Sequence, residues 1–356
     1  MRFTELRAEQ QRQLIDTVDV FHAWRNAKID QRRRFAGSMR WVERNGKNYL
    51  LRKIGSRERS LGPQDAETQD AYDSFVSGRD RNRDLLAGLA SRLNQMAPIN
   101  KAMGLGRVPL LAARILRELD DRELLGHQLF VVGTNAIFAY EARAGVRVAS
   151  ELLATGDVDL LLDVRQRLSL VGREVRSVGL LGILQRLDHS FASQRKNGFR
   201  AVNRDGYFVD LIRPEARDPI GDKAPDSLSS LPEELHGSPI RGLGWLVNAP
   251  RFEAVAIAED GYPVLIVCMD PRIYALHKAW ISRDEKRDPR KKARDLEQAK
   301  ACAAIASSRL GLSFKDGSAL SVLPASVKAL EPLIVDSDDG PQSNEDTGEQ
   351  NLTPGW

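Results

Sequence analysis

Cysteine is scarce in this sequence, and its scarcity excludes two kinds of protein. Cys268 and Cys302 are the two cysteines among 356 residues. Two cysteines are too few for a disulfide framework or a cysteine-rich zinc site. The histidines show no zinc-ligand spacing either; they are His22, His127, His189, His236 and His277. We therefore expect neither a disulfide-stapled scaffold nor a structural zinc protein.

Long apolar runs and common nucleophile motifs are also absent. No uninterrupted apolar stretch approaches the roughly 20 residues that a bilayer span requires. The first residues, MRFTELRAEQQRQ, contain no apolar segment of the kind found in secretory signals. No Gly-x-Ser-x-Gly motif or Cys–His pair indicates covalent catalysis. These absences predict a cytoplasmic protein without membrane contact.

The composition is that of a folded and mildly basic chain. Hydrophobic residues make up 42% and charged residues 29%, and the formal net charge is +4. This length allows two or three folded units, each with its own core. A small positive excess suits an anionic ligand such as a nucleotide or RNA, but it is equally common in other soluble proteins. The function must therefore be inferred from motifs.

Helical spacing and one turn motif organise the N-terminal third. Apolar residues recur at near-helical spacing across residues 1–36. Residues 39–42 and 49–51 flank Asn45-Gly46, a strong β-hairpin signal. Helices are also expected over residues 64–96 and 108–119, with Pro109 in the first turn of the second. We expect residues 1–120 to form an N-terminal helical region with a β-hairpin near residues 39–52.

The middle of the chain alternates between strands and helices. Four short strands are predicted, at residues 129–132, 158–162, 199–202 and 207–212. A predicted helix follows the first strand and reaches residue 144. This order indicates an α/β core over residues 121–217. Residues 218–250 are rich in Pro, Gly and Ser, which predicts a loop or linker.

The C-terminal third begins with a second predicted hairpin. Residues 252–257 and 264–269 are apolar and are separated by Glu259-Asp260-Gly261, and a helical pattern follows to residue 310. We expect a C-terminal hairpin and helical subdomain over residues 251–335. Residues 336–356 include DSDDGPQSNEDTGEQ, which carries acids and no base and predicts a disordered acidic tail.

Gly133-Thr134-Asn135 stands between a buried strand and a helix. A small residue lets the backbone approach a phosphate, and a helix N-terminus offers free N–H groups and a positive dipole. Strand–Gly–helix junctions are also common in α/β proteins without a phosphate site. The junction is therefore a candidate nucleotide-binding element that needs support from other residues.

Asp157 and Asp159 supply that support. Alternate residues of a strand point to one face, so the two carboxylates project together while Val158 enters the core. Two carboxylates at such a short separation repel each other unless a cation lies between them. Mg²⁺ prefers hard oxygen ligands of this kind. A solvated strand end is the alternative interpretation.

Asp210 lies within the apolar strand Tyr207-Phe208-Val209-Asp210-Leu211-Ile212. A carboxylate is costly to bury there unless it is paired or coordinates a metal. A third ligand on a strand next to Asp157 and Asp159 would complete a two-metal site. Asp205 competes for this role, although Asp205-Gly206 fits a tight turn better.

Together these residues resemble the DNA polymerase β nucleotidyltransferase superfamily. Its pattern is a glycine with a small polar residue opening a helix, an acidic–apolar–acidic strand, and an acid on a later strand. The resemblance covers residues 125–215 and implies a mixed sheet with flanking helices, an α/β (α+β) fold. Thr134 stands where serine is more frequent, and it keeps the hydroxyl.

The resemblance implies a chemistry and a role for each residue. A nucleophile would attack the α-phosphate of a nucleoside triphosphate such as ATP, and pyrophosphate would leave. Asp157, Asp159 and Asp210 would be the catalytic residues and would hold two Mg²⁺ ions, with Mn²⁺ as an alternative. Asp210 would also help to orient the nucleophile. Gly133, Thr134 and Asn135 would contact the nucleotide.

Residues 270–300 resemble the helical half of the bacterial minimal and AbiEii-like nucleotidyltransferases. A helix that contains Lys278 precedes a helix with Lys291, Arg294 and Asp295. In that interpretation Lys278 and Lys291 would face the triphosphate, and Asp295 would hold the basic side chains in place. A basic, solvated helix pair is the alternative.

The sequence leaves three functions open. The first is a nucleotidyltransferase whose acceptor is a tRNA, a protein or a small molecule. The second is a non-catalytic nucleotide- or RNA-binding regulator. The third is a toxin or defence component that modifies tRNA or protein and has a cognate partner protein, as in toxin–antitoxin pairs.

Overall fold

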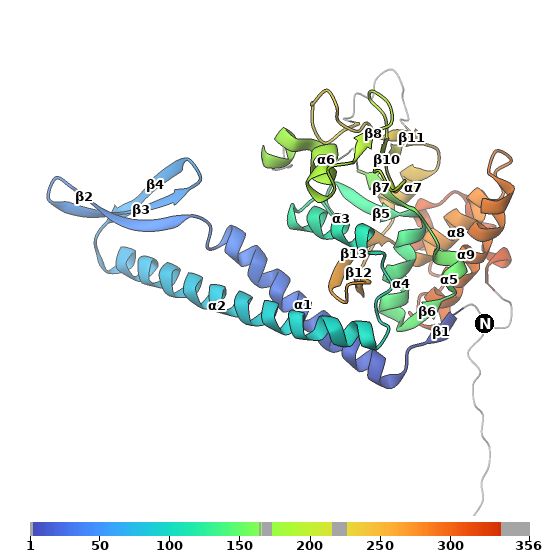
Figure 1. The fold of residues 1–356 in the computed structure, drawn as a ribbon, viewed down its shortest axis with the longest axis horizontal. Coiled ribbons are helices and arrows are strands. Elements are labelled where there is room, and N and C mark those ends of the chain that lie inside the picture. The colour runs from blue at the N-terminus through green and yellow to red at the C-terminus, as the bar shows by residue number, and fades with distance from the viewer. Residues whose placement is uncertain (1–2, 164, 166–172, 216–225, 336–356) are drawn as a thin grey trace, which may run out of the picture.

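An arm of two long helices projects from the body of the molecule (Figure 1). The computed structural model describes residues 3–163, 165, 173–215 and 226–335. Helices α1 (Ala8–Arg33) and α2 (Ala66–Ala102) run side by side as an antiparallel pair. A three-stranded antiparallel sheet joins them at the far end of the arm, formed by β2 (Ser38–Arg44), β3 (Lys47–Ile54) and β4 (Arg57–Pro63).

Local sequence signals account for most of the arm. Asn45 and Gly46 have φ values of 54° and 71°, as a two-residue type I′ turn requires, so the expected hairpin is confirmed. Asp65 begins α2 by accepting a 2.8 Å hydrogen bond from the backbone N–H of Thr68. Strand β4 is not predicted by its sequence, because apart from Leu61 its residues RERSLGP are polar or breaker types, and they show no apolar alternation.

The body is built around a mixed sheet with strand order β5-β7-β10-β9-β8, and β11 pairs with the end of β10. Strands β7 and β10 are parallel neighbours at its centre, and β5 runs antiparallel to β7. The strand bounds are β5 Leu129–Val132, β7 Asp157–Leu162, β8 Ala192–Ser193, β9 Arg200–Val202, β10 Phe208–Pro214 and β11 Ser238–Ile240.

Short helices connect and cover these strands. The 3-10 turn η1 (Gly133–Ala136) leads from β5 into α4 (Ile137–Ala144), and α5 (Ser150–Leu153) precedes β7. Between them β6 (Val146–Val148) pairs with β1 (Phe3–Glu5), so the first described residues form a strand where helix was expected. Helix α3 (Leu110–Asp121) begins after Pro109, and α6 (Arg173–Leu187) is kinked at Gly179.

A hairpin and two helices complete the body, as expected for residues 251–335. Strands β12 (Arg251–Ile257) and β13 (Pro263–Met269) pair in antiparallel register, and α8 (Pro271–Ser282) packs against α9 (Pro289–Ser308). The short helix α10 (Ala325–Lys328) follows, with 3-10 turns at Ala319–Val322 and Glu331–Leu333. Strand β11 and helix α7 (Leu243–Asn248) lie in the segment expected to be a loop. The expected tail, residues 336–356, lies outside the described residues.

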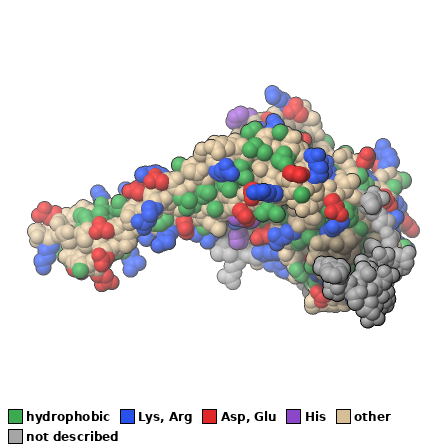
Figure 2. All heavy atoms as spheres, turned by 90° about the horizontal axis from the view of Figure 1, so that it is seen from below, with side chains coloured by type: hydrophobic (Ala, Val, Ile, Leu, Met, Phe, Trp, Pro, Cys, Tyr) green, Lys and Arg blue, Asp and Glu red, His purple; other side chains and the backbone are tan. Residues whose placement is uncertain are grey.

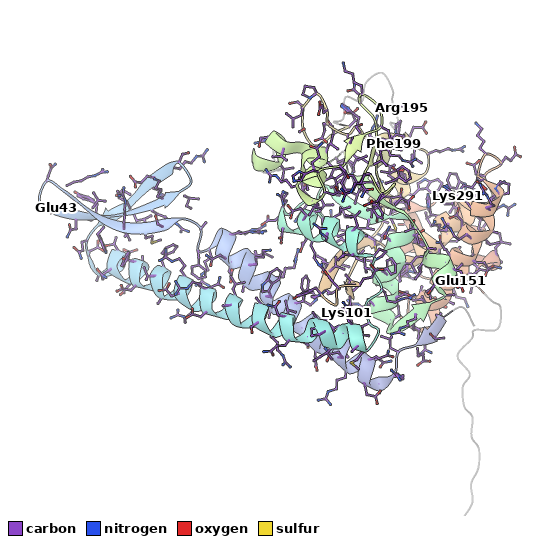
Figure 3. All side chains as sticks on the ribbon, viewed as in Figure 1. Glu43, Lys101, Glu151, Arg195, Phe199 and Lys291 are labelled. Atoms are coloured by element: carbon purple, nitrogen blue, oxygen red, sulfur yellow. The ribbon has the colours of Figure 1, made fainter. Side chains whose placement is uncertain are left out.

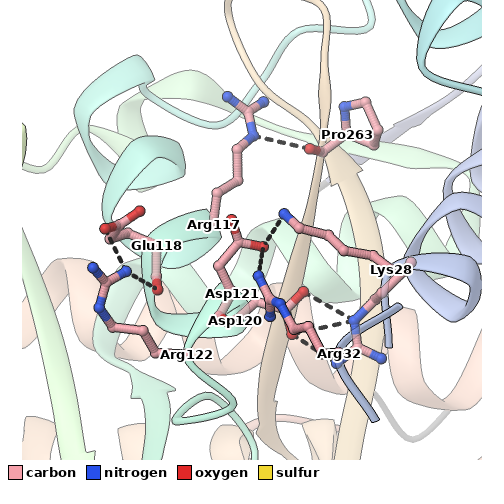
Figure 4. Close-up of polar contacts among 9 residues, drawn as sticks. Lys28, Arg32, Arg117, Glu118, Asp120, Asp121, Arg122 and Pro263 are labelled. Carbon is pink, nitrogen blue, oxygen red and sulfur yellow. Dashed lines mark hydrogen bonds and ion pairs between the residues drawn. The ribbon is translucent and has the colours of Figure 1, made fainter. Parts of the chain in front are cut away.

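Ion pairs fasten the arm to the body where α1 crosses the end of α3 (Figure 4). Arg25 pairs with Asp120 at 2.6 Å, and Lys28 pairs with Asp121 at 2.5 Å. Arg32 also contacts Asp121. The base of the arm is therefore held by both charge and packing, because Phe21 and Leu93 belong to the same buried cluster as the body.

One main hydrophobic cluster extends through the body and into the base of the arm. Figure 2 shows the resulting outline, an elongated molecule whose arm tapers away from a bulky body. The expected α/β (α+β) class, a mixed sheet with flanking helices, is confirmed. Within the described residues, no helix combines the length and the apolar character needed to span a bilayer.

Candidate functional site

Gly133 brings the turn after β5 against the neighbouring strand β7. Its φ is +66°, and a Cβ atom built on it would lie 2.1 Å from Oδ2 of Asp159. The backbone oxygen of Gly133 accepts a 3.1 Å hydrogen bond from the hydroxyl of Tyr274. A residue with a side chain could not occupy this position without displacing Asp159. Glycine is thus required both by the backbone conformation and by the room available.

The next two residues of the turn are buried and hydrogen-bonded. Thr134 accepts a 3.2 Å hydrogen bond at Oγ1 from Nε2 of Gln298 on α9. Asn135 donates a 2.7 Å hydrogen bond from Nδ2 to the backbone oxygen of Asp157. The turn is therefore tied to β7 on one side and to α9 on the other.

Asp157 and Asp159 lie at the start of β7, on the same face of the strand. Val158 between them is fully buried, as strand alternation requires. The hydroxyl of Thr155 donates a hydrogen bond to Asp157. Burial and the nearby carboxylates of Asp157 and Asp210 raise the pKa of Asp159 to about 7. The carboxyl of Asp159 is therefore protonated more easily than an ordinary carboxyl.

Asp210 lies directly beside Asp159, because β10 is paired with β7 in a register that places these two residues opposite each other. It is 6% exposed, whereas Asp205 lies in the turn before β10 with a well-exposed side chain. The structure thus brings Asp157, Asp159 and Asp210 together on the two central strands. It places Asp205 in the turn chemistry expected of an Asp-Gly pair.

Arg200 engages both oxygens of Asp210 and was not predicted from the sequence. Its Nε lies 2.6 Å from Oδ1 and its Nη2 lies 2.5 Å from Oδ2. The guanidinium also lies near the rings of Phe199 and Phe208, with centroid distances of 5.5 and 4.8 Å. The signal for this contact is the antiparallel register of β9 and β10, in which Arg200 is the cross-strand partner of Asp210.

A buried charge network lies on the α8–α9 side of the site. Lys278 is 5% exposed, and its Nζ lies 2.8 Å from Oδ1 of Asp295, which is fully buried. Arg287 reaches Oδ2 of the same carboxylate at 2.8 Å. Burial lowers the pKa of Lys278, while Asp295 and the nearby Asp159 act in the opposite direction.

Lys291 differs from Lys278 in its surroundings. It is exposed in the first turn of α9, and Figure 3 labels it on the outer part of the α8–α9 side. Asp295 therefore holds Lys278 and Arg287, rather than the Lys278 and Lys291 expected from the sequence. Phe199, labelled near the top of the body in the same view, is also exposed beside Arg200.

The carboxylate oxygens of the site are ligands of the kind that divalent cations such as Mg²⁺ prefer. Among the described residues, no group of three or more His, Cys, Asp or Glu side chains is already arranged for a metal ion. Two features nevertheless fit one: the raised pKa of Asp159, which a nearby cation would reverse, and the all-oxygen chemistry of the carboxylates. Further polar atoms in this region have no hydrogen-bond partner within the described chain: Oδ1 of Asn135, the hydroxyl of Tyr207 and Oε1 of Gln298.

The site thus consists of a glycine turn packed against paired carboxylates on the mixed sheet of an α/β protein, with a buried lysine on the α8 side. The chain belongs to the nucleotidyltransferase family, because a family model described as Nucleotidyltransferase matches residues 111–321. That span contains the whole acidic site and excludes the arm. Membership implies a nucleoside triphosphate substrate and transferase activity. No curated protein and no solved structure matches the chain.

Proposed function

We propose that this protein transfers a nucleoside monophosphate group from a nucleoside triphosphate to an acceptor and releases pyrophosphate. The observation that carries the proposal is the strand register that aligns Asp210 with Asp159. It gathers three carboxylates from separate parts of the sequence next to the Gly133 turn. Isolated strand-end acids would have no reason to converge in this way, because their mutual repulsion is unfavourable without a cation.

In this proposal Asp157, Asp159 and Asp210 hold two Mg²⁺ ions, for which Mn²⁺ can substitute. The ions would supply positive charge to the triphosphate and to the developing leaving group. Asp210 is engaged by Arg200 in the free protein, so cation binding requires this carboxylate to exchange partners. Arg200 would then be available to contact an anionic group of the substrate.

The remaining residues bind and orient the triphosphate. Because Gly133 has no side chain, the backbone of the turn lies directly against Asp159, and the hydroxyl of Thr134 would contact a phosphate bound there. Asn135 keeps the turn attached to β7. Lys278 would contribute positive charge from the α8 side, and the exposed Lys291 would add charge from the first turn of α9.

The reaction forms a bond between the acceptor oxygen and the α-phosphorus. The bond from the α-phosphorus to the bridging oxygen breaks, and pyrophosphate leaves with the electron pair of that bond. The acceptor hydroxyl loses its proton to the carboxylate of Asp210. This chemistry supports the proposal that the protein is of the polymerase β type, and the Lys278–Asp295 helix pair supports the bacterial minimal and AbiEii-like branch.

Replacing single acids tests the proposal. Asp157→Asn and Asp159→Asn should each reduce transfer of an α-labelled NMP group by on the order of 10²-fold or more, because each removes charge required in the transition state. Pyrophosphate release and product labelling are measured with each NTP, Mg²⁺ and a cell extract as the acceptor source.

Asp205→Asn is the matched control, since this exposed acid lies between β9 and β10 outside the trio. It should retain the activity of the unmodified chain. Asp157→Asn or Asp159→Asn proteins that turn over NTP at the unmodified rate would rule out the mechanism.

The Arg200–Asp210 pair also supports a second candidate function, a nucleotide-binding regulator without turnover. A carboxylate that is permanently neutralised by an arginine could not join a metal site. Titration of the protein with Mg²⁺ and NTP separates the two. A regulator would bind NTP without releasing pyrophosphate, and its affinity for NTP would not depend on the divalent ion.

A further inference from the structure

The sheet at the tip of the arm is strongly basic. Residues 38–63 contain seven Lys and Arg residues and two Glu residues, a net charge of +5, whereas the whole chain carries +4. The other residues therefore sum to −1. This segment is outside the matched span 111–321.

Most of these basic side chains are exposed and have no acidic partner. Arg40 pairs with Glu58, and Arg52 packs over Phe75 and donates to the backbone oxygen of Arg34. Within the described part of the chain, no ion pair is formed by the other five, which are Arg44, Lys47, Lys53, Arg57 and Arg59. We call these five residues the basic tip.

The acids of α2 lie on the side of that helix away from the sheet that carries the basic tip. Trp41 of the sheet contacts Tyr72 of α2, and Arg52 of the sheet contacts Phe75 of α2. At 3.6 residues per turn, Asp70 and Asp73 lie on the opposite side of the helix. Figure 2 shows basic side chains projecting at the end of the arm, with acidic ones also present on that view. The positive charge is thus carried by the strands and the negative charge by the outer side of α2.

The apolar and aromatic side chains of the tip sheet are mostly used in packing, so the tip would recognise a ligand mainly through charge. Leu50 and Leu51 are almost fully buried, and Trp41 packs on Tyr72 with ring centroids 5.9 Å apart. The aromatic residues therefore hold the sheet to α2. Ile54 and Leu61 are the two large apolar side chains of the sheet that are exposed, and they do not form a broad apolar surface.

The arm places this charge far from the acid trio. Helix α2 has 37 residues, so it is about 55 Å long at 1.5 Å per residue. Its base is fixed by the Arg25–Asp120 and Lys28–Asp121 pairs (Figure 4). A ligand that contacts both the tip and the body must be extended and stiff, and a small metabolite is neither.

We propose that the basic tip binds the phosphate backbone of a folded RNA whose end reaches the acid trio. Exposed Arg and Lys side chains contact phosphates and position a helix without reading its bases. The choice of RNA rests on the proposed function, because a transfer site needs an acceptor with a free end. Cellular RNAs are short chains with such ends, whereas genomic DNA has few.

The test measures binding of the full chain to a labelled RNA hairpin in the absence of NTP and Mg²⁺, so that it does not depend on catalysis. One variant carries Arg44→Glu and Lys47→Glu, and a second carries Arg57→Glu and Arg59→Glu. Each should weaken binding at least about tenfold and reduce the slope of log affinity against log salt by roughly two, one for each lost phosphate contact.

The matched control carries Lys315→Glu and Lys328→Glu, which make the same change in net charge at exposed sites on the body. It should bind the RNA like the unmodified chain. Thermal melting of all variants confirms that the fold is retained, and a conservative Arg57→Lys, Arg59→Lys protein should restore binding if either Glu variant melts early.

Three results would overturn the proposal. The tip variants and the control could weaken binding equally, a DNA hairpin of the same sequence could bind as tightly as the RNA, or vesicles with anionic lipid could bind the tip in place of RNA. Edge-strand charge can also serve to prevent strand pairing between copies. In that case the tip variants would leave RNA affinity unchanged, and this fourth result would also overturn the proposal. Tip-dependent RNA binding together with absent pyrophosphate release would overturn the proposed function instead.

Discussion

At the scale of single residues, the contact between Gly133 and Asp159 links the turn after β5 to the acidic strands. Two separate constraints act on Gly133. Its φ of +66° disfavours any side chain, and a Cβ would lie 2.1 Å from a carboxylate oxygen of Asp159. The first constraint concerns stability alone, whereas the second concerns the position of a candidate catalytic group. A pair of substitutions can separate them.

Gly133→Ala should lower both stability and transfer activity. The left-handed backbone alone costs about 1 kcal/mol. The collision adds a further loss and displaces Asp159, so we expect transfer to fall at least about tenfold, as misplaced catalytic groups generally do. Urea unfolding and pyrophosphate release measure the two effects.

Gly46→Ala is the control for the stability cost of a side chain on a left-handed backbone. Gly46 has a φ of +71°, and no atom lies within 4 Å of the position that a Cβ would take, so this change carries the strain without the collision. It should cost about 1 kcal/mol and leave transfer unchanged. Equal losses of activity in the two variants would show that room beside Asp159 is unimportant.

Individual site residues differed in how far the sequence could predict them. Asp157 and Asp159 could be paired from strand alternation alone, and burial separated Asp210 from Asp205 as expected. Arg200 could not be found, because its pairing with Asp210 depends on the register between β9 and β10, and that register is set by tertiary structure. The exposure of Lys291 likewise depends on where α9 begins.

At the scale of elements, helices α8 and α9 are joined by a buried charge pair. Lys278 and Asp295 are both buried, which makes the pair expensive to break. A buried ion pair often contributes little net stability compared with apolar residues of similar size. The presence of this pair is therefore better explained by a function for Lys278 near Asp159 than by stability.

Asp295→Ala should destabilise the protein by about 3–5 kcal/mol, because it leaves the ammonium of Lys278 buried without a partner. The double variant Lys278→Met, Asp295→Leu should recover most of that loss in urea unfolding, since the half-exposed Arg287 can reach solvent. Transfer activity should stay low in the double variant. Recovery of full activity together with stability would show that Lys278 has no role with the triphosphate.

Elements with strong local signals were predicted, and those that depend on neighbours were not. The Asn45-Gly46 hairpin, α3 after Pro109 and the β12–β13 hairpin all carry turn or capping residues. Strand β4 and the short elements β11 and α7 lack such signals. They are stabilised by pairing and packing against partners that are distant in sequence, which local propensity does not report.

At the scale of the whole molecule, the arm divides into a tip and a base with different relations to the body. Phe21 and Leu93 at the base are buried in the main cluster, and Trp24 packs against it. The same side chains line a cavity with Pro263 and Leu265 of the body. The tip sheet, in contrast, packs against α2 of the arm. We therefore propose that the base of the arm belongs to the folding unit of the body, whereas the tip sheet packs on the arm alone and is not part of that unit.

Two deletions test this division. Replacing residues 38–63 by a short Gly-Ser link between α1 and α2 should change the melting temperature of the body by only a few degrees, because the sheet packs on the arm rather than on the body. Removing residues 1–105 should instead destabilise it by several kcal/mol, since each buried Phe or Leu contributes about 1.5–3 kcal/mol. A body that melts at the same temperature without residues 1–105 would place the whole arm outside the folding unit. The shorter deletion should also keep metal-dependent pyrophosphate release while losing RNA affinity, because it removes the basic tip and leaves the acid trio intact.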